Sequence, residues 1–167
     1  MKKNLLFMFV ALLGVFSFAS CGDDDDNDNN PGTIPSGVEQ AMQTQFPNAT
    51  NIKWEKKGVY LVADFDDARL DKEAWFTRDG EWKMTETDYG KDLFYLPADV
   101  EKAFATGEYG TWTVDDVKLY ERGDKTFYLF EVEKTGQRDM ELYYNIDGTV
   151  IKAVPDSDAD ITPDTVI

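Results

Sequence analysis

Histidine is absent from the sequence, cysteine occurs once, and acidic residues outnumber basic ones. Without histidine, the chain lacks the usual general base of enzymes and the commonest metal ligand. One cysteine excludes a disulfide within the chain. With 17 basic and 33 acidic residues, for a net charge of -16, the chain also lacks the electrostatic footprint of a nucleic-acid-binding protein.

Long apolar runs are scarce too, and the one at the N-terminus predicts export. Two lysines precede apolar residues 5–18, and two small residues then precede Cys21. This run is too short for a membrane span and has the layout of a secretory signal. A cysteine at this point resembles the bacterial lipobox, so we expect residues 1–20 to be a lipoprotein signal peptide and Cys21 to carry the lipid. A buried structural role is disfavoured, because the polyanion that follows Cys21 cannot enter a core.

The run of aspartates and asparagines after Cys21 predicts an acidic tether over residues 21–33. Repelling carboxylates without apolar neighbours cannot bury enough surface to become ordered. An EF-hand calcium loop is disfavoured, since its glycine turn and bidentate glutamate are missing. The run also resembles the signal by which Bacteroides-type bacteria send lipoproteins to the outer face of the outer membrane. We therefore expect a lipid-anchored cell-envelope protein in the outer membrane, on either its surface or its periplasmic side.

An internal repeat organises the rest of the chain. Residues 34–42 (IPSGVEQAM) match 96–104 (LPADVEKAF), and residues 73–80 (EAWFTRDG) match 141–148 (ELYYNIDG). Each copy reads as a helix that begins after a proline, followed by short strands rich in aromatic and β-branched residues. We predict an α+β fold of two tandem repeats, each with a helix packed on a four-stranded antiparallel sheet. The predicted boundaries are 34–92 for the first repeat, 93–155 for the second and 156–167 for an acidic tail.

The Asp-Gly turn of each copy decides which side chains face the helix. A type I turn with a glycine bulge pairs Thr77 with Glu81 and Asn145 with Thr149. With this turn, equivalent side chains of the two copies lie on the same face of the sheet. The face toward the helices is then predicted to carry Ala74, Phe76, Trp82, Met84, Leu142, Tyr144 and Val150. The solvent-facing side is predicted to carry Trp75, Thr77, Lys83, Tyr143, Asn145 and Ile151.

The duplicated order and the Asp-Gly hairpins resemble the PepSY-like, β-lactamase-inhibitor-protein-like (BLIP-like) lipoproteins of Bacteroides-type bacteria, over roughly residues 34–154. The resemblance implies a sheet with an open face, no enzymatic activity, and binding of protein partners through aromatic residues. It does not imply β-lactamase inhibition, because no binding-loop residue can be transferred.

Acid-rich residues around the second and third strands are the alternative site for chemistry. Two carboxylates suffice for glycoside hydrolysis, and oxygen ligands suit cations. Clusters of this kind are more often solvated edges, so we expect no catalytic residue, metal or cofactor. The residues concerned are Asp64, Asp66, Asp67, Asp71 and Glu73.

The aromatic face is the preferred binding site. Trp75 and Tyr143 hold equivalent positions in the two copies, and large rigid rings are what interface cores use. Trp112 extends this face or fills the junction between repeats, and Lys53, Lys118 and Tyr120 flank it. Burial of both rings by a loop or by the other repeat is the opposing interpretation. The predicted function is non-catalytic binding of a macromolecule, with a protein as the preferred partner and with small-ligand or glycan binding and modulation of a secreted protease as alternatives. If so, alanine at Trp75 and Tyr143 leaves the fold intact and abolishes partner capture.

Overall fold

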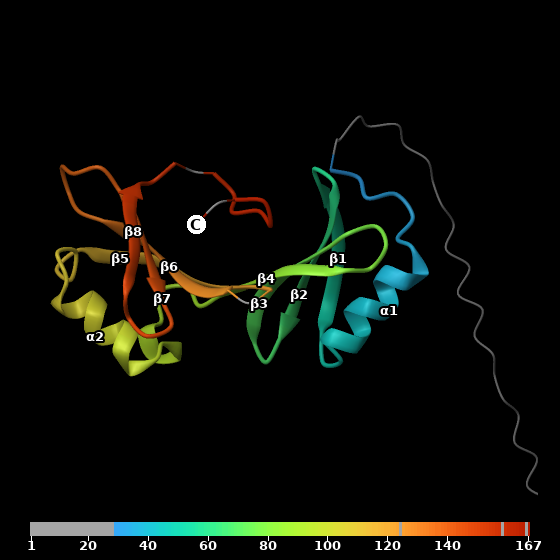
Figure 1. The fold of residues 1–167 in the computed structure, drawn as a ribbon, viewed down its shortest axis with the longest axis horizontal. Coiled ribbons are helices and arrows are strands. Elements are labelled where there is room, and N and C mark those ends of the chain that lie inside the picture. Colours follow the sequence, from blue (N-terminus) through green and yellow to red (C-terminus); the bar gives the residue numbers. More distant parts are fainter. Residues whose placement is uncertain (1–28, 124, 158, 166) are drawn as a thin grey trace, which may run out of the picture.

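The computed structural model describes residues 29–123, 125–157, 159–165 and 167. Within these residues, a helix followed by four strands occurs twice along the chain (Figure 1). The first set comprises α1 (Ser36–Gln45), β1 (Thr50–Lys57), β2 (Tyr60–Asp67), β3 (Leu70–Phe76) and β4 (Trp82–Asp88). After a short 3-10 helix, η1 (Leu93–Tyr95), come α2 (Ala98–Thr106), β5 (Thr113–Arg122), β6 (Lys125–Glu133), β7 (Met140–Asn145) and β8 (Val150–Pro155).

The strands form one antiparallel sheet of eight, in the order β1 to β8. Strands β4 and β5 pair from Thr85–Glu121 to Asp88–Lys118, which joins the two halves. The predicted fold class is therefore wrong: the chain is mostly β, and it does not form two repeats of a helix on a separate four-stranded sheet. The physical reason is that each four-stranded set would leave an unpaired edge, and the edges of β4 and β5 satisfy each other's backbone groups.

Both helices pack through side chains four residues apart. Val38 and Met42 of α1 lie in a core with residues of β2 and β3, including Phe65. Val100 and Phe104 of α2 lie in a second core with residues of β5, β6 and β7. Figure 1 shows the helices toward opposite ends of the sheet. Each helix begins after a proline with extended backbone, as expected for a residue whose missing N–H is not needed there.

A third apolar cluster lies on the other side of the sheet, which we call the open face because neither helix covers it. Because side chains alternate across a strand, Trp75 points away from its neighbours Ala74 and Phe76, which face α1. The buried members of this cluster are Val62, Trp75, Met84, Tyr120, Phe127, Leu129, Tyr143 and Ile161. Ile161 comes from the chain after β8, which turns back toward the middle of the sheet (Figure 1).

The predicted bulged turns are confirmed in both hairpins. The N–H of Thr77 donates to Glu81 O at 2.9 Å, and that of Gly80 donates to Thr77 O at 3.0 Å. Asn145, Thr149 and Gly148 repeat this arrangement at the same distances. Gly80 and Gly148 have φ of 86° and 82°, values that favour glycine.

A second irregularity next to each turn was not predicted. In the first hairpin, Phe76 pairs with Trp82 but Trp75 pairs with Met84, so Lys83 is an extra residue. In the second hairpin, the corresponding extra residue is Ile151. Because side chains alternate along a strand, one extra residue moves each later side chain of that strand to the opposite face of the sheet. The predicted position of Met84 is therefore wrong: it lies with Trp75 on the open face.

Candidate binding face

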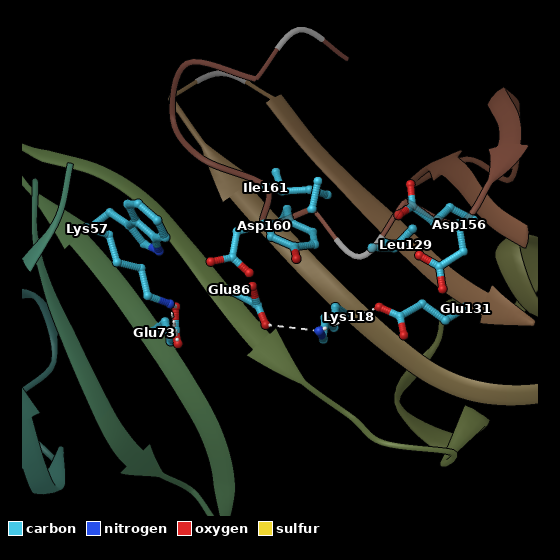
Figure 2. A pocket seen from close by; sticks show the side chains of 13 residues that line it. Lys57, Glu73, Glu86, Lys118, Leu129, Glu131, Asp156, Asp160 and Ile161 are labelled. Carbon is cyan, nitrogen blue, oxygen red and sulfur yellow. Dashed lines mark hydrogen bonds and ion pairs between the residues drawn. The ribbon is translucent and has the colours of Figure 1, made fainter. Parts of the chain in front are cut away.

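A row of charged side chains crosses the middle of the open face. Lys57 Nζ lies 2.9 Å from a carboxylate oxygen of Glu73, and Lys118 Nζ lies 3.6 Å from oxygens of both Glu86 and Glu131. Figure 2 shows Lys57 beside Glu73, and Lys118 between Glu86 and Glu131. Glu73 and Glu86 are direct cross-strand neighbours, a pairing that would repel if no lysine flanked it.

Burial and charge shift the pKa values in this row. Burial raises the pKa of Glu86, and the attraction of Lys118 offsets this only in part. The pKa of Glu131 is raised in the same way. For Lys118, burial alone lowers the pKa, but the attraction of Glu86, Glu131 and Asp116 outweighs burial and raises it overall. The row is thus a set of partly desolvated charges, and at Glu86 and Glu131 the effect of burial on the pKa exceeds that of the ion pair.

These charges line a cleft of about 330 Å³ between the sheet and the returning chain. The sheet side includes Lys57, Glu86, Lys118 and Tyr120, and the other side is made by residues 159–161. In Figure 2, Asp160 lies above Glu86, and Ile161 lies further from it on the same side of the cleft. Burial and the neighbouring charge of Glu86 raise the pKa of the Tyr120 hydroxyl, so this group stays protonated and able to donate.

The expectation that Trp75 and Tyr143 face solvent is wrong. Their exposed fractions are 1% and 3%. Both lie on the open face as predicted, but they are buried within the open-face cluster, to which Ile161 of the returning chain also belongs. Alanine at either position therefore removes core packing, and loss of partner capture by such a variant would not identify an interface.

Each of the two rings also has a lysine over it. Lys57 Nζ lies 5.3 Å from the ring centre of Trp75, and Lys152 Nζ lies 4.3 Å from that of Tyr143. The Tyr143 hydroxyl donates to Glu141 at 2.6 Å, whereas Trp75 Nε1 has no hydrogen-bond partner within the described residues. An unmatched donor in a buried ring is unfavourable, because it lost its water without gaining an acceptor.

The other predicted site residues divide between the two sides of the sheet. Lys83 is half-buried and lies 2.7 Å from Glu81. Asn145 and Ile151 line an apolar groove of about 460 Å³ together with Phe127, Ile146 and Ile167. Thr77 contributes to its turn. Trp112 packs near Tyr109 in the core under α2, so the structure does not bring it to the open face.

Among the flanking residues, Lys118 and Tyr120 line the central cleft, and Lys53 lines a neighbouring one. Among the acid-rich residues, Asp66 of β2 lies opposite Asp71 of β3, and a hydrogen bond to Asp66 raises the pKa of Asp71. In the described part of the chain, no three acidic, cysteine or histidine side chains are arranged to hold a metal ion. Cys21 lies outside the described residues.

The chain after β8 is the part of the site that the sequence reading missed. Residues 156–167 are predicted to be an acidic tail, but Ile161 is buried and Ile167 packs against the open-face cluster. Arg122 Nη1 donates to the carbonyls of Thr162, Pro163 and Thr165 at 3.3, 3.2 and 2.6 Å. Two isoleucines within a segment that also holds four aspartates are the sequence signal that could have indicated docking.

The chain belongs to the PepSY-like family. The family model described as "Putative beta-lactamase-inhibitor-like, PepSY-like" matches residues 59–152. The chain is also similar to a solved BLIP-like protein from Bacteroides fragilis, with a TM-score of 0.75 and 34% identity over 84% of this chain and 100% of that one. The predicted resemblance is thereby confirmed.

Two further solved structures are similar. A DUF2874 family protein from Bacteroides ovatus has a TM-score of 0.69 and 28% identity, over 74% of this chain and 89% of that one. A Bacteroides eggerthii protein described as "putative periplasmic" has a TM-score of 0.68 and 30% identity, over 74% and 90%. No protein with a curated description matches significantly. Among the described residues, no helix is both long and apolar enough to cross a membrane.

Proposed function

We propose that the chain is a lipid-anchored, non-catalytic protein of the bacterial cell envelope that binds a protein partner through the open face. The observation that carries this proposal is the uneven cover of the sheet. One face is packed under two helices, whereas the open face carries a charged cleft and an apolar groove beneath a single stretch of irregular chain. A face that offers an accessible apolar groove beside charged side chains has the make-up of a protein interface.

Envelope localisation rests on the signal-like N-terminus ending at Cys21 and on the periplasmic description of one relative. The non-catalytic role rests on the inhibitor-like family description and on a chain without histidine. A protein partner is favoured over a glycan, because stacking on a sugar needs an open ring face and the rings of Trp75 and Tyr143 have none. The groove beside Asn145, Ile146 and Ile151 offers the accessible apolar surface instead.

Site-specific photocrosslinking of the full chain in living cells tests this proposal. A photoreactive residue is introduced at Ile146, which is 56% exposed beside the groove, or at the matched control Ile52, which is 42% exposed beside α1. We expect one crosslinked protein, identified by mass spectrometry, from position 146 and none from position 52. Equal products from both positions, or none from position 146, would contradict binding through the open face.

A further inference from the structure

The irregular chain over the open face, residues 159–165 and 167, is held there as a ligand would be; we call it the tail segment. Its Ile161 is 6% exposed and inserts among the side chains of the open-face cluster, including Trp75 and Leu129. Its Ile167 packs against the same cluster at the apolar groove. Two aliphatic side chains therefore occupy two places on one face, as anchor residues of a bound peptide do.

Most polar contacts between the sheet and the tail segment are made to backbone carbonyls. The Arg122 guanidinium donates to three consecutive or nearly consecutive carbonyls, those of Thr162, Pro163 and Thr165. The Tyr60 hydroxyl donates to the Asp164 carboxylate at 3.0 and 3.1 Å. Backbone carbonyls occur in any peptide, so only the aliphatic anchor and the carboxylate specify the sequence.

The hold on the tail segment is incomplete. Its described residues form no strand. The hydrogen bonds within them join Thr162 and Thr165 in one turn, in which Thr165 N donates to Thr162 O. The cleft that Ile161 helps to line still contains Trp75, whose Nε1 lacks a hydrogen-bond acceptor among the described residues. A better-matched ligand would supply that acceptor, which the seated tail segment does not.

From these contacts we propose that the open face is a peptide-binding groove and that the tail segment is its intramolecular ligand. The external ligand is a segment of a partner protein with an aliphatic side chain followed within a few residues by a carboxylate, and it displaces the tail segment. This inference rests on the proposed function, whose partner class it specifies. Covalent attachment gives a short tethered segment an effective concentration on the order of millimolar, so the tail segment excludes weak ligands.

A fluorescent peptide with the sequence of residues 159–167 tests the inference by anisotropy against the full chain. Ile161→Ser in the chain removes the anchor of the tethered competitor but leaves the groove intact. We expect this variant to bind the peptide about tenfold or more tightly than the unmodified chain, from the burial of one isoleucine. A peptide carrying the same Ile-to-Ser change should not bind, and Arg122→Gln added to Ile161→Ser should remove binding.

Asp164→Asn gives a second variant that does not disturb the core, because Asp164 is exposed and its carboxylate contacts Tyr60. It should increase peptide binding by a smaller factor. Asp99→Asn, the same change at an exposed position of α2 on the other side of the sheet, should leave binding unchanged. Absence of peptide binding by folded Ile161→Ser, or by Asp164→Asn if the first variant unfolds, overturns the inference. The anisotropy assay involves this chain alone, so its failure is separate from failure of the crosslinking experiment.

Discussion

Two glycines determine how closely each hairpin approaches its helix. A Cβ added to Gly80 would lie 3.0 Å from the backbone oxygen of Gly37, and one added to Gly148 would lie 2.5 Å from that of Asp99. Both contacts are with the first turn of a helix, where the backbone cannot easily move. The same residue type therefore serves two needs, positive φ and close packing.

At this scale we predict that Gly148→Ala is more destabilising than Gly136→Ala. Gly136 has a similar φ of 79°, but a Cβ there would meet nothing within 4 Å. Gly136→Ala should lower the free energy of unfolding by about 1–2 kcal/mol through backbone strain. Gly148→Ala should lower the free energy of unfolding by about 1–3 kcal/mol more, because its Cβ would overlap with α2. Urea denaturation measures both, and equal losses would mean that the hairpin does not pack on the helix.

Among the elements, the helices and the tail segment cover the two faces in different ways. Helix α2 is held by interdigitating side chains, with Phe104 stacked on Phe130 at 4.9 Å between ring centres. The tail segment depends mainly on Ile161 and on the bonds from Arg122 and Tyr60. This difference in packing makes the tail segment the cover that can leave without loss of the fold.

For the element α2, we predict that Phe104→Ala lowers the free energy of unfolding by about 3–5 kcal/mol. Phe104 is 5% exposed, whereas Phe94 in η1 is 87% exposed. Phe94→Ala, the same chemical change, should therefore stay within about 0.5 kcal/mol of the unmodified chain. Chemical denaturation followed by circular dichroism compares the two, and a small loss at Phe104 would show that α2 is dispensable for stability.

Across the whole molecule, one continuous sheet concentrates acidic groups on the open face of an already acidic chain of net charge -16. Burial raises the pKa values of Glu86 and Glu131, and burial together with Asp88 raises that of Asp116. A raised carboxyl pKa means that the folded chain holds the proton more tightly than the unfolded chain does. The stabilisation is present when the group is protonated and is lost as pH rises through the folded pKa.

We therefore predict that the chain becomes more stable as pH falls from 7 toward the ordinary glutamate value of 4.5. The pKa of Lys118 is also raised, but its contribution changes only above its ordinary value of 10.5, outside this window. Urea denaturation at several pH values between 7 and 5 should give a rising free energy of unfolding. Glu86→Gln should flatten the trend, and a fall in stability over this range would contradict the raised carboxyl pKa values.

Local features were predicted from the sequence because local chemistry determines them. Proline at each helix start, apolar residues four apart and the Asp-Gly turns correctly located both helices and both bulged hairpins. The second bulge at Lys83 was missed, since nothing at that position distinguishes an extra residue from regular strand. Met84 was consequently assigned to the wrong face.

By itself, the sequence determined the element order, the family resemblance and the side of the sheet on which Trp75 and Tyr143 lie, because these follow from local periodicity and turn geometry. The pairing of β4 with β5 and the burial of both rings in a cluster that includes Ile161 depend on the tertiary structure. Edge pairing and surface cover depend on which distant segments meet in space. Alternation along a strand separates its two faces, but it does not reveal what another segment places on either of them.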